Sequence, residues 1–279
     1  MSILPRALIS AFAFLIPSFA TAGDLTVPVG EPLPVYQAAP VASPGLVFTI
    51  RGGASVTPDY FGSGDYSVGP DFAVGLNFLR LPGGRSFGSY DPNNPQYGLG
   101  LRGSFRYIDE RSAADYPELN GLNDVDTSVE LGLGLAYSSR NFDAFADLRY
   151  GVIGHESFVG EVGADVKFQA NDRLTLSAGP RLFIGSDKYS STYFGVTAAE
   201  AGAVGSNFAG QAFNAGGGLL SAGVEVGAKY KINDDWGLEG AVTWDRFTGD
   251  AADSPIVQQG ERDQYGVRIG ITRRITLDF

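Results

Sequence analysis

The chain of 279 residues contains no cysteine, only one histidine and, beyond residue 20, no apolar run that approaches the length of a transmembrane helix. Without cysteine it has no disulfide, no thiol nucleophile and no lipidation site for a lipoprotein anchor. The lack of long apolar runs excludes a helical membrane protein. Positive charge is also scarce: 20 Lys and Arg stand against 31 Asp and Glu, and the net charge is −11. This balance argues against a nucleic-acid partner, which requires a basic surface.

Glycine and aromatic residues, in contrast, are abundant. The chain has 39 glycines, 12% of its residues are aromatic, and its mean hydropathy is zero. Strands that alternate apolar and polar residues average to a neutral hydropathy, so this composition is compatible with a membrane β-barrel. A water-soluble barrel with an apolar interior is the alternative.

The first 22 residues have the pattern of an export signal. Arg6 gives a positive start, residues 7–20 are almost all apolar, and Ala-Thr-Ala at 20–22 is the small-x-small pattern of a signal peptidase site. We therefore expect the mature chain to start near Gly23. Residues 23–45 then contain five prolines with few charges, and closely spaced prolines favour an extended or disordered chain. We expect a periplasmic tail, either a passive linker or a docking segment for a partner.

From Leu46 onward, apolar and polar residues alternate with a period of two. Between Tyr97 and Tyr107 the odd positions are mainly aromatic or leucine, whereas the even positions are glycine, serine and arginine. This alternation predicts strands with one apolar and one polar face. An extra hairpin around residues 85–90 would raise the number of strands from ten to twelve; either number is even and returns both termini to one side of a membrane. The ten predicted strands are residues 46–56, 71–81, 97–108, 127–138, 142–153, 158–168, 174–185, 218–231, 236–247 and 264–279.

The predicted connections alternate between short and long. Turns rich in Asn and Asp follow several strands, and four of the other connections are long. Short turns on one rim, long loops on the other and aromatic residues at both strand ends are features of outer-membrane barrels and favour that class over a soluble barrel. The long connections are residues 57–70, 109–126, 186–217 and 248–263. The predicted aromatic girdles are Phe78, Tyr97, Tyr137, Phe142, Phe168, Tyr230, Trp236 and Phe279 at the periplasmic rim, and Tyr107, Tyr150, Phe158, Trp244 and Tyr265 at the outer rim.

Three segments resemble one known family. Residues 53–70 read Gly-x4-Pro-Asp-Tyr-Phe-Gly-Ser-x2-Tyr-x3-Pro, residues 193–201 contain Tyr-Phe-Gly-Val-Thr followed by Glu-Ala, and residues 253–256 read Asp-Ser-Pro-Ile. With the barrel pattern, they resemble the MipA/OmpV family of outer-membrane proteins over essentially all of residues 46–279. The resemblance implies a location in the outer membrane of a Gram-negative bacterium. It also implies a scaffold that brings a murein lytic transglycosylase together with a penicillin-binding protein, while other members look like porins or adhesins.

The end of the chain fits the same class. Residues 274–279 alternate up to the C-terminal Phe279, which looks like the signal by which the barrel-assembly machinery recognises its clients. Phe279 also suits the aromatic girdle, and the two roles are compatible. The expected surroundings are thus outer-membrane lipid and lipopolysaccharide, with the barrel-assembly machinery as a partner during insertion.

If the apolar faces meet lipid, the charged faces point into the lumen. Acidic and basic residues occur there in similar numbers, and they are expected to form pairs because unpaired charges away from bulk water are costly. A ten-stranded barrel is only slightly wider than one filled by its own side chains, so we expect a narrow or closed lumen, with a small gated pore as the alternative. The expected lumen network is Arg102, Arg106, Glu130, Asp147, Arg149, Glu161, Asp165, Arg181 and Glu225.

The long loops carry aromatic residues that would be exposed to water if the loops extended outward. We therefore expect Tyr60, Phe61, Tyr193 and Phe194 to pack inside the mouth as a plug. Because a murein-enzyme scaffold needs a periplasmic surface, partner binding would then rest on the tail and on residues 82–96.

No catalytic, cofactor-binding or metal-binding site is expected. His155 lies in Gly-His-Glu-Ser at 154–157, and these residue types suit acyl transfer. Neighbours on an extended chain point to opposite faces, however, so His155 and Glu156 are not expected to act as a catalytic base and the acid that orients it. We expect His155 to be an ordinary histidine of a surface loop. The acidic loops match no calcium loop, and the glycines at 216–218 match no phosphate loop.

Overall fold

A computed structural model describes residues 44–91, 93 and 97–278, which lie within one compact unit, Ala42–Phe279. The predicted signal peptide, the proline-rich segment up to residue 43 and Phe279 lie outside the described residues. The unit is an all-β antiparallel barrel, as predicted. Its strands are β1 (Leu46–Pro58), β2 (Tyr66–Arg80), β3 (Ser86–Gly88), β4 (Gly98–Ile108), β5 (Ser128–Ser138), β6 (Phe142–Ile153), β7 (Phe158–Gln169), β8 (Leu174–Gly185), β9 (Gly218–Lys231), β10 (Trp236–Phe247) and β11 (Asp263–Leu277).

Strands consecutive in sequence pair with each other except β3 and β4, and β1 also pairs with β11 along its length. The ten long strands lie where the alternation placed them. The expected extra hairpin is instead one short strand, β3, paired with the end of β2. β2 begins at Tyr66 rather than at residue 71, because the β1–β2 ladder continues to the pair Pro58 and Tyr66. Pro70 lies inside that ladder, on a strand whose other edge is largely unpaired, where proline is tolerated.

The sheet curls until its two edges meet at β2 and β4. A Cβ added at Gly103 on β4 would lie 3.9 Å from the Val74 carbonyl oxygen on β2, so the strands are adjacent. Within the described residues, however, no hydrogen-bonded ladder joins them. The barrel is therefore nearly closed, with one seam in its wall.

The outer face of the barrel is apolar. Leu131, Leu133 and Leu135 on β5 are all exposed on this face, as the period of two predicted, and the expected girdle residues within the described chain are exposed as well, with one exception. The exception is Phe78, which is buried, its ring centroid 5.4 Å from that of Tyr90. This outer face is suited to lipid.

Leu133 offers a test of the lipid face, because its side chain is 69% exposed near the middle of β5. Leu133→Arg is expected to lower the free energy of unfolding in lipid by about 2–4 kcal/mol, as a charge at the bilayer midplane does. The measurement is denaturant unfolding in lipid vesicles. A loss below about 1 kcal/mol, the cost of such a charge near the interface, would place Leu133 away from the bilayer core.

The matched control for this test must be a residue that faces the lumen. Gly134→Ser on the lumen face of β5 is unsuitable: a Cβ there would lie 1.9 Å from an Asp147 oxygen and 2.8 Å from the Ala146 carbonyl. Gly100 on β4 has nothing within 4 Å of its Cβ position. Gly100→Ser is therefore expected to leave stability nearly unchanged.

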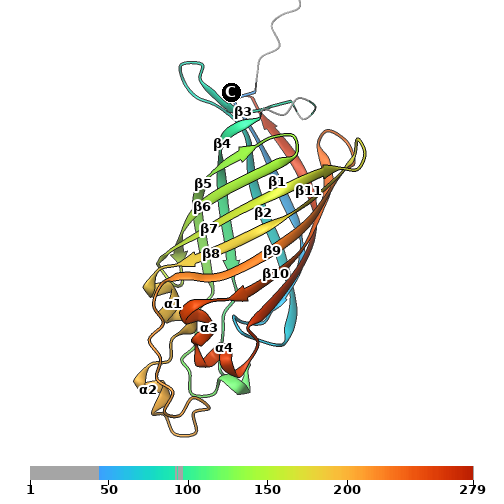
Figure 1. The fold of residues 1–279 in the computed structure, drawn as a ribbon. Helices are drawn as coiled ribbons and strands as arrows, with labels where there is room; N and C mark the ends of the chain where they lie inside the picture. The colour runs from blue at the N-terminus through green and yellow to red at the C-terminus, as the bar shows by residue number, and fades with distance from the viewer. Residues whose placement is uncertain (1–43, 92, 94–96, 279) are drawn as a thin grey trace, which may run out of the picture. The chain divides into compact units, whose positions relative to one another are not determined.

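The two ends of the barrel differ (Figure 1). The long connections and all helices lie at one end and form what we call the cap; short turns, β3 and the C-terminus lie at the other, which we call the turn end. None of the helices in the described chain is long and apolar enough to cross a membrane. The cap contains the 3-10 helix η1 (Pro117–Leu119) and the helices α1 (Asp187–Phe194), α2 (Ala198–Ala201), α3 (Gly249–Asp253) and α4 (Pro255–Gln259).

Candidate functional site: the capped lumen

The cap has an apolar core that spans the mouth of the barrel. Phe61 lies in its middle, with ring centroids 5.1 Å from Tyr193 and 5.8 Å from Phe194. Tyr60 packs in a second cluster with Tyr116, at 5.2 Å. The first cluster also includes side chains at the cap ends of five strands, so the loops cover the opening instead of extending away from it. Those strand residues are Ile108, Val159, Phe183, Leu220 and Phe247.

Hydrogen bonds join the separate loops of the cap. Arg111 donates to the Tyr193 carbonyl at 2.9 Å, and Ser254 donates to the Phe194 carbonyl at 2.6 Å. The Tyr193 hydroxyl in turn donates to Ser128 Oγ at 2.8 Å. Two other connections and the start of β5 are thus fixed to α1.

Glu200 holds α2 to the neighbouring loop. Thr197 and Glu200 form a capping box, and a Glu200 oxygen also accepts the Asn123 backbone N–H at 2.7 Å. Burial alone would raise the pKa of Glu200, but these hydrogen bonds and the nearby Arg111 lower it below its ordinary value. The carboxylate is therefore charged at neutral pH and keeps the cap linked.

On the lumen side of the cap, Arg149 on β6 is the centre of a buried ion-pair cluster. Its guanidinium donates to Glu130 at 2.8 Å, to Glu161 at 2.9 Å and to Ser104 Oγ at 3.1 Å. Ser104 also donates to Asp147 at 2.9 Å, and Arg102 pairs with the other Asp147 oxygen at 3.2 Å. The cluster joins the consecutive strands β4, β5, β6 and β7 on their lumen face.

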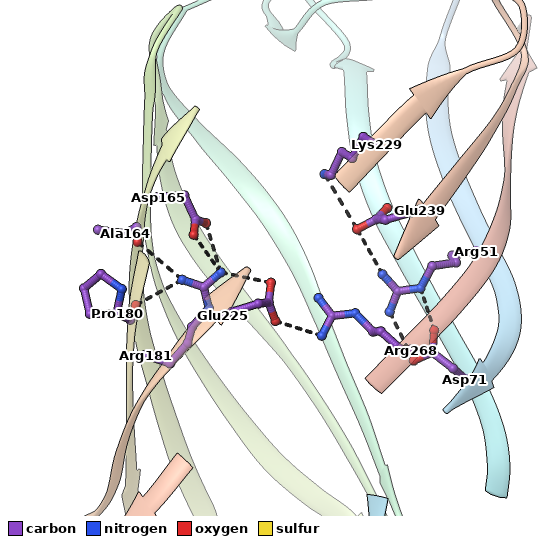
Figure 2. Close-up of polar contacts among 10 residues, drawn as sticks. All are labelled: Arg51, Asp71, Ala164, Asp165, Pro180, Arg181, Glu225, Lys229, Glu239 and Arg268. Atoms are coloured by element: carbon purple, nitrogen blue, oxygen red, sulfur yellow. Dashed lines mark hydrogen bonds and ion pairs between the residues drawn. The ribbon is translucent and has the colours of Figure 1, made fainter. Parts of the chain in front are cut away.

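Two further clusters line the lumen (Figure 2). Arg181 on β8 pairs with Asp165 and with Glu225, each at 3.0 Å, and Arg268 on β11 pairs with Glu225 at 2.8 Å. The remaining cluster is centred on Arg51, whose partners are Asp71 at 2.6 Å and Glu239 at 3.2 Å. The alternation placed these charges in the lumen, but it did not indicate which residues would pair.

Arg106 differs from the other predicted network residues. No carboxylate among the described residues lies within ion-pair distance of its guanidinium. Its guanidinium carbon instead lies 4.8 Å from the ring centroid of Phe183 and 5.4 Å from that of Phe61. Phe61 comes from a loop that covers the mouth, so this contact exists only when the cap is folded. Contacts with aromatic rings thus take the place of the ion pair expected for Arg106.

His155 is not a surface-loop histidine. Its side chain is buried, with Nδ1 2.7 Å from Ser157 Oγ and Nε2 3.2 Å from a Glu130 oxygen. The expectation failed because it considered only neighbours in sequence, whereas Glu130 comes from another strand. Serine, histidine and carboxylate side chains are thus in contact. Ser157 is buried as well, however, so the cluster has a structural role and supports the cap. Within the described residues, no group of His, Asp and Glu is arranged to hold a metal ion.

Comparisons with known proteins give one family. A family model described as MltA-interacting protein MipA matches residues 50–275. Among proteins with curated descriptions, no sequence matches the chain. Similar solved structures include the NanC porin, with 11% identity, a TM-score of 0.35 and coverage of 82% of this chain and 100% of that one. An outer membrane channel from Pseudomonas putida F1 has 11% identity, a TM-score of 0.39 and coverage of 87% and 99%.

With TM-scores this low, the solved structures carry no inference about the present chain. The family match does support an inference about the chain, because it spans most of the sequence. The nearly closed antiparallel barrel, its apolar outer face and its two aromatic rims are the features of an outer-membrane barrel. The chain therefore belongs to the MipA family of MltA-interacting proteins, and it is an outer-membrane β-barrel protein.

Proposed function

We propose that the protein is a non-enzymatic scaffold that holds murein-synthesising and murein-hydrolysing enzymes at the inner face of the outer membrane of a Gram-negative bacterium. Its partners would be a murein lytic transglycosylase and a penicillin-binding protein; the description of the matching family supports the first. In the membrane, the apolar outer face would contact lipid and lipopolysaccharide. The barrel-assembly machinery would insert the chain.

The observation that carries this proposal is the blocked lumen. Ion pairs between adjacent strands and between strands two apart line the lumen, and the cap core covers its mouth. A barrel filled in this way is better suited to anchoring than to conducting. The partners must then bind at the turn end, which faces the periplasm when long loops point outward.

The turn end offers an apolar surface beside β3. Phe87, Tyr90 and Tyr97 are exposed there, and exposed apolar groups of this kind mark contact sites. This segment is also fixed in place, because Arg274 donates a hydrogen bond to the Tyr90 carbonyl and Lys231 donates to Asn93 Oδ1 at 2.7 Å. A fixed apolar surface loses less entropy on binding than a mobile one.

The test is partner capture by a chain that lacks residues 24–44. We expect the deletion to abolish pull-down of the transglycosylase and the penicillin-binding protein from detergent-solubilised envelopes, while the barrel still assembles and still migrates faster on unboiled gels. Gly45 must remain, because its backbone N–H donates to Leu277 at 2.9 Å. A matched variant, Phe87→Ser with Tyr90→Ser, tests the surface beside β3. Undiminished capture by both variants would refute the scaffold.

A small-solute porin or adhesin-like barrel is the second candidate. It is favoured by the partial exposure of lumen charges, such as the 38% side-chain exposure of Arg102. Water that reaches these groups would let small ions pass if the cap moved. Discrete channels from the unmodified protein in planar bilayers would favour this candidate over the scaffold.

A further inference from the structure

Buried hydroxyls and one guanidinium nitrogen at and near α1 have no hydrogen-bond partner among the described residues; Ser186 and Ser190 supply two of the hydroxyls. Tyr189 on α1 is completely buried, yet its hydroxyl has no partner among the described residues. The same holds for Nη2 of the buried Arg149, and Arg106 has only its aromatic contacts. Buried donors without acceptors are rare in folded proteins and costly, so each calls for an explanation.

Their contacts place these donors around one space. The ring centroid of Tyr189 lies 5.4 Å from that of Phe183 and 6.3 Å from that of Phe61, the two rings that the Arg106 guanidinium covers. On the other side, Tyr189 lies 5.0 Å from His155, which contacts Glu130, the partner of Arg149. Tyr189 thus lies between Arg106 and Arg149, at the cap end of the lumen.

The Tyr189 hydroxyl acts as a donor there. Burial raises the pKa of Tyr189 well above its ordinary value, and the nearby Arg106 is the main opposing influence. At neutral pH the group therefore keeps its proton. A neutral hydroxyl beside two guanidinium groups stabilises negative charge by hydrogen bonding without adding a negative charge of its own.

Two of the neighbouring carboxylates are already used. Glu130 accepts from Arg149 and contacts His155, and Glu161 accepts from Arg149. Asp245 makes no ion pair among the described residues, although it is near enough to Arg106 to interact with its charge; its oxygen lies over Gly223, 2.3 Å from where a Cβ would be. None of these carboxylates accepts a hydrogen bond from the Tyr189 hydroxyl or from Arg149 Nη2. Arg106 itself is only partly buried.

We propose that this space binds an oxyanion, either the carboxylate or the phosphate group of a small solute. The guanidinium groups of Arg106 and Arg149 would hold two of its oxygens, and the Tyr189 hydroxyl would donate from above. Guanidinium groups match carboxylate and phosphate oxygens in geometry as well as charge. The site does not depend on the scaffold role, since it uses only groups of the lumen and of α1.

The test is titration calorimetry on the purified mature chain in detergent, with sodium phosphate and sodium acetate as probes at constant ionic strength. We expect saturable binding of at least one probe with one site per chain; which of the two binds distinguishes a phosphate from a carboxylate ligand. Arg106→Gln should weaken binding about tenfold or more, as loss of one charge-assisted hydrogen bond does. Arg106→Lys keeps the charge and provides the measurement if the glutamine variant does not fold.

Tyr189→Phe is the sharpest variant, because it removes only the hydroxyl and keeps the ring in the cap core. It should weaken binding of the probe several-fold. Without the probe, its unfolding temperature should equal or exceed that of the unmodified chain, because an unpaired buried hydroxyl has been removed. The control is Arg246→Gln, whose arginine pairs with Asp263 and is partly exposed, so its affinity should not change.

Three results would overturn the proposal. They are no saturable binding of either probe, an unchanged affinity in both the Arg106 and Tyr189 variants, or a lower unfolding temperature for Tyr189→Phe without the probe. The last result would mean that the hydroxyl already has a partner, such as water. Loss of partner capture with intact phosphate or acetate binding would refute the scaffold alone.

Discussion

Replacing residues 187–216 by a short turn is expected to convert a barrel without resolvable channels into one that conducts ions in discrete steps. This connection supplies Tyr189, Tyr193 and Phe194, the largest buried part of the cap core. Gly185 and Gly218 are direct partners in the β8–β9 ladder, so a short turn can join the strands without disturbing them. Conductance in planar bilayers and antibiotic entry into cells both measure the effect.

The control for this deletion is Val204→Ser, at a fully exposed position in the same connection, which should change neither measurement. If the shortened barrel admits neither ions nor antibiotics, the cap is not the barrier to passage. The ion pairs below it would then close the lumen by themselves. Conduction by the unmodified chain would instead show that the cap leaves a path open.

Arg149→Met is expected to lower the free energy of unfolding by about 3–5 kcal/mol, the usual loss when one partner of a buried ion pair is removed. The side chains of Arg149 and Glu130 are 3% and 0% exposed, so the variant leaves a buried carboxylate without its main cation. Water cannot replace that cation at a site so little exposed. Denaturant unfolding in detergent, followed by tryptophan fluorescence, measures the loss.

Adding Glu130→Gln to Arg149→Met should recover part of this stability, because an unpaired charge costs more than a neutral amide. The comparison is Lys188→Met, which breaks the exposed pair of Lys188 with Glu156 and should cost about 1 kcal/mol or less. Equal losses for Arg149→Met and Lys188→Met would show that the lumen pairs are solvated like surface pairs. The lumen would then be a water-filled channel.

Local patterns in the sequence were sufficient to locate most of the wall of the barrel. A strand shows its two faces through residues two positions apart, and a turn shows itself through Asn, Asp and Gly within a few residues. For this reason the positions of the ten long strands and the lipid-facing side of β5 agree with the structure. β3 was harder to predict, because three residues are too few to show a period, and the start of β2 was obscured by Gly69 and Pro70.

The same patterns did not reveal the contacts in the lumen or the cap. Which arginine pairs with which carboxylate depends on strand register and on distances across the barrel, as in the pairing of Arg181 with Glu225 between β8 and β9. His155 shows the consequence: its neighbours in sequence indicated exposure, whereas Glu130 on β5 and Tyr189 on α1 enclose it.

The sequence by itself determined the class of fold, the face that each strand turns to lipid and the rim on which the long loops lie, because each of these depends on residues close together in the chain. Only the tertiary structure decided which side chains meet in the cap, that Arg106 faces aromatic rings in place of a carboxylate, and that the Tyr189 hydroxyl has no partner among the described residues. These features arise where segments 40 or more residues apart meet, since Arg106, Arg149 and Tyr189 come from different elements. Closure of the barrel brings them together, and no local pattern encodes it.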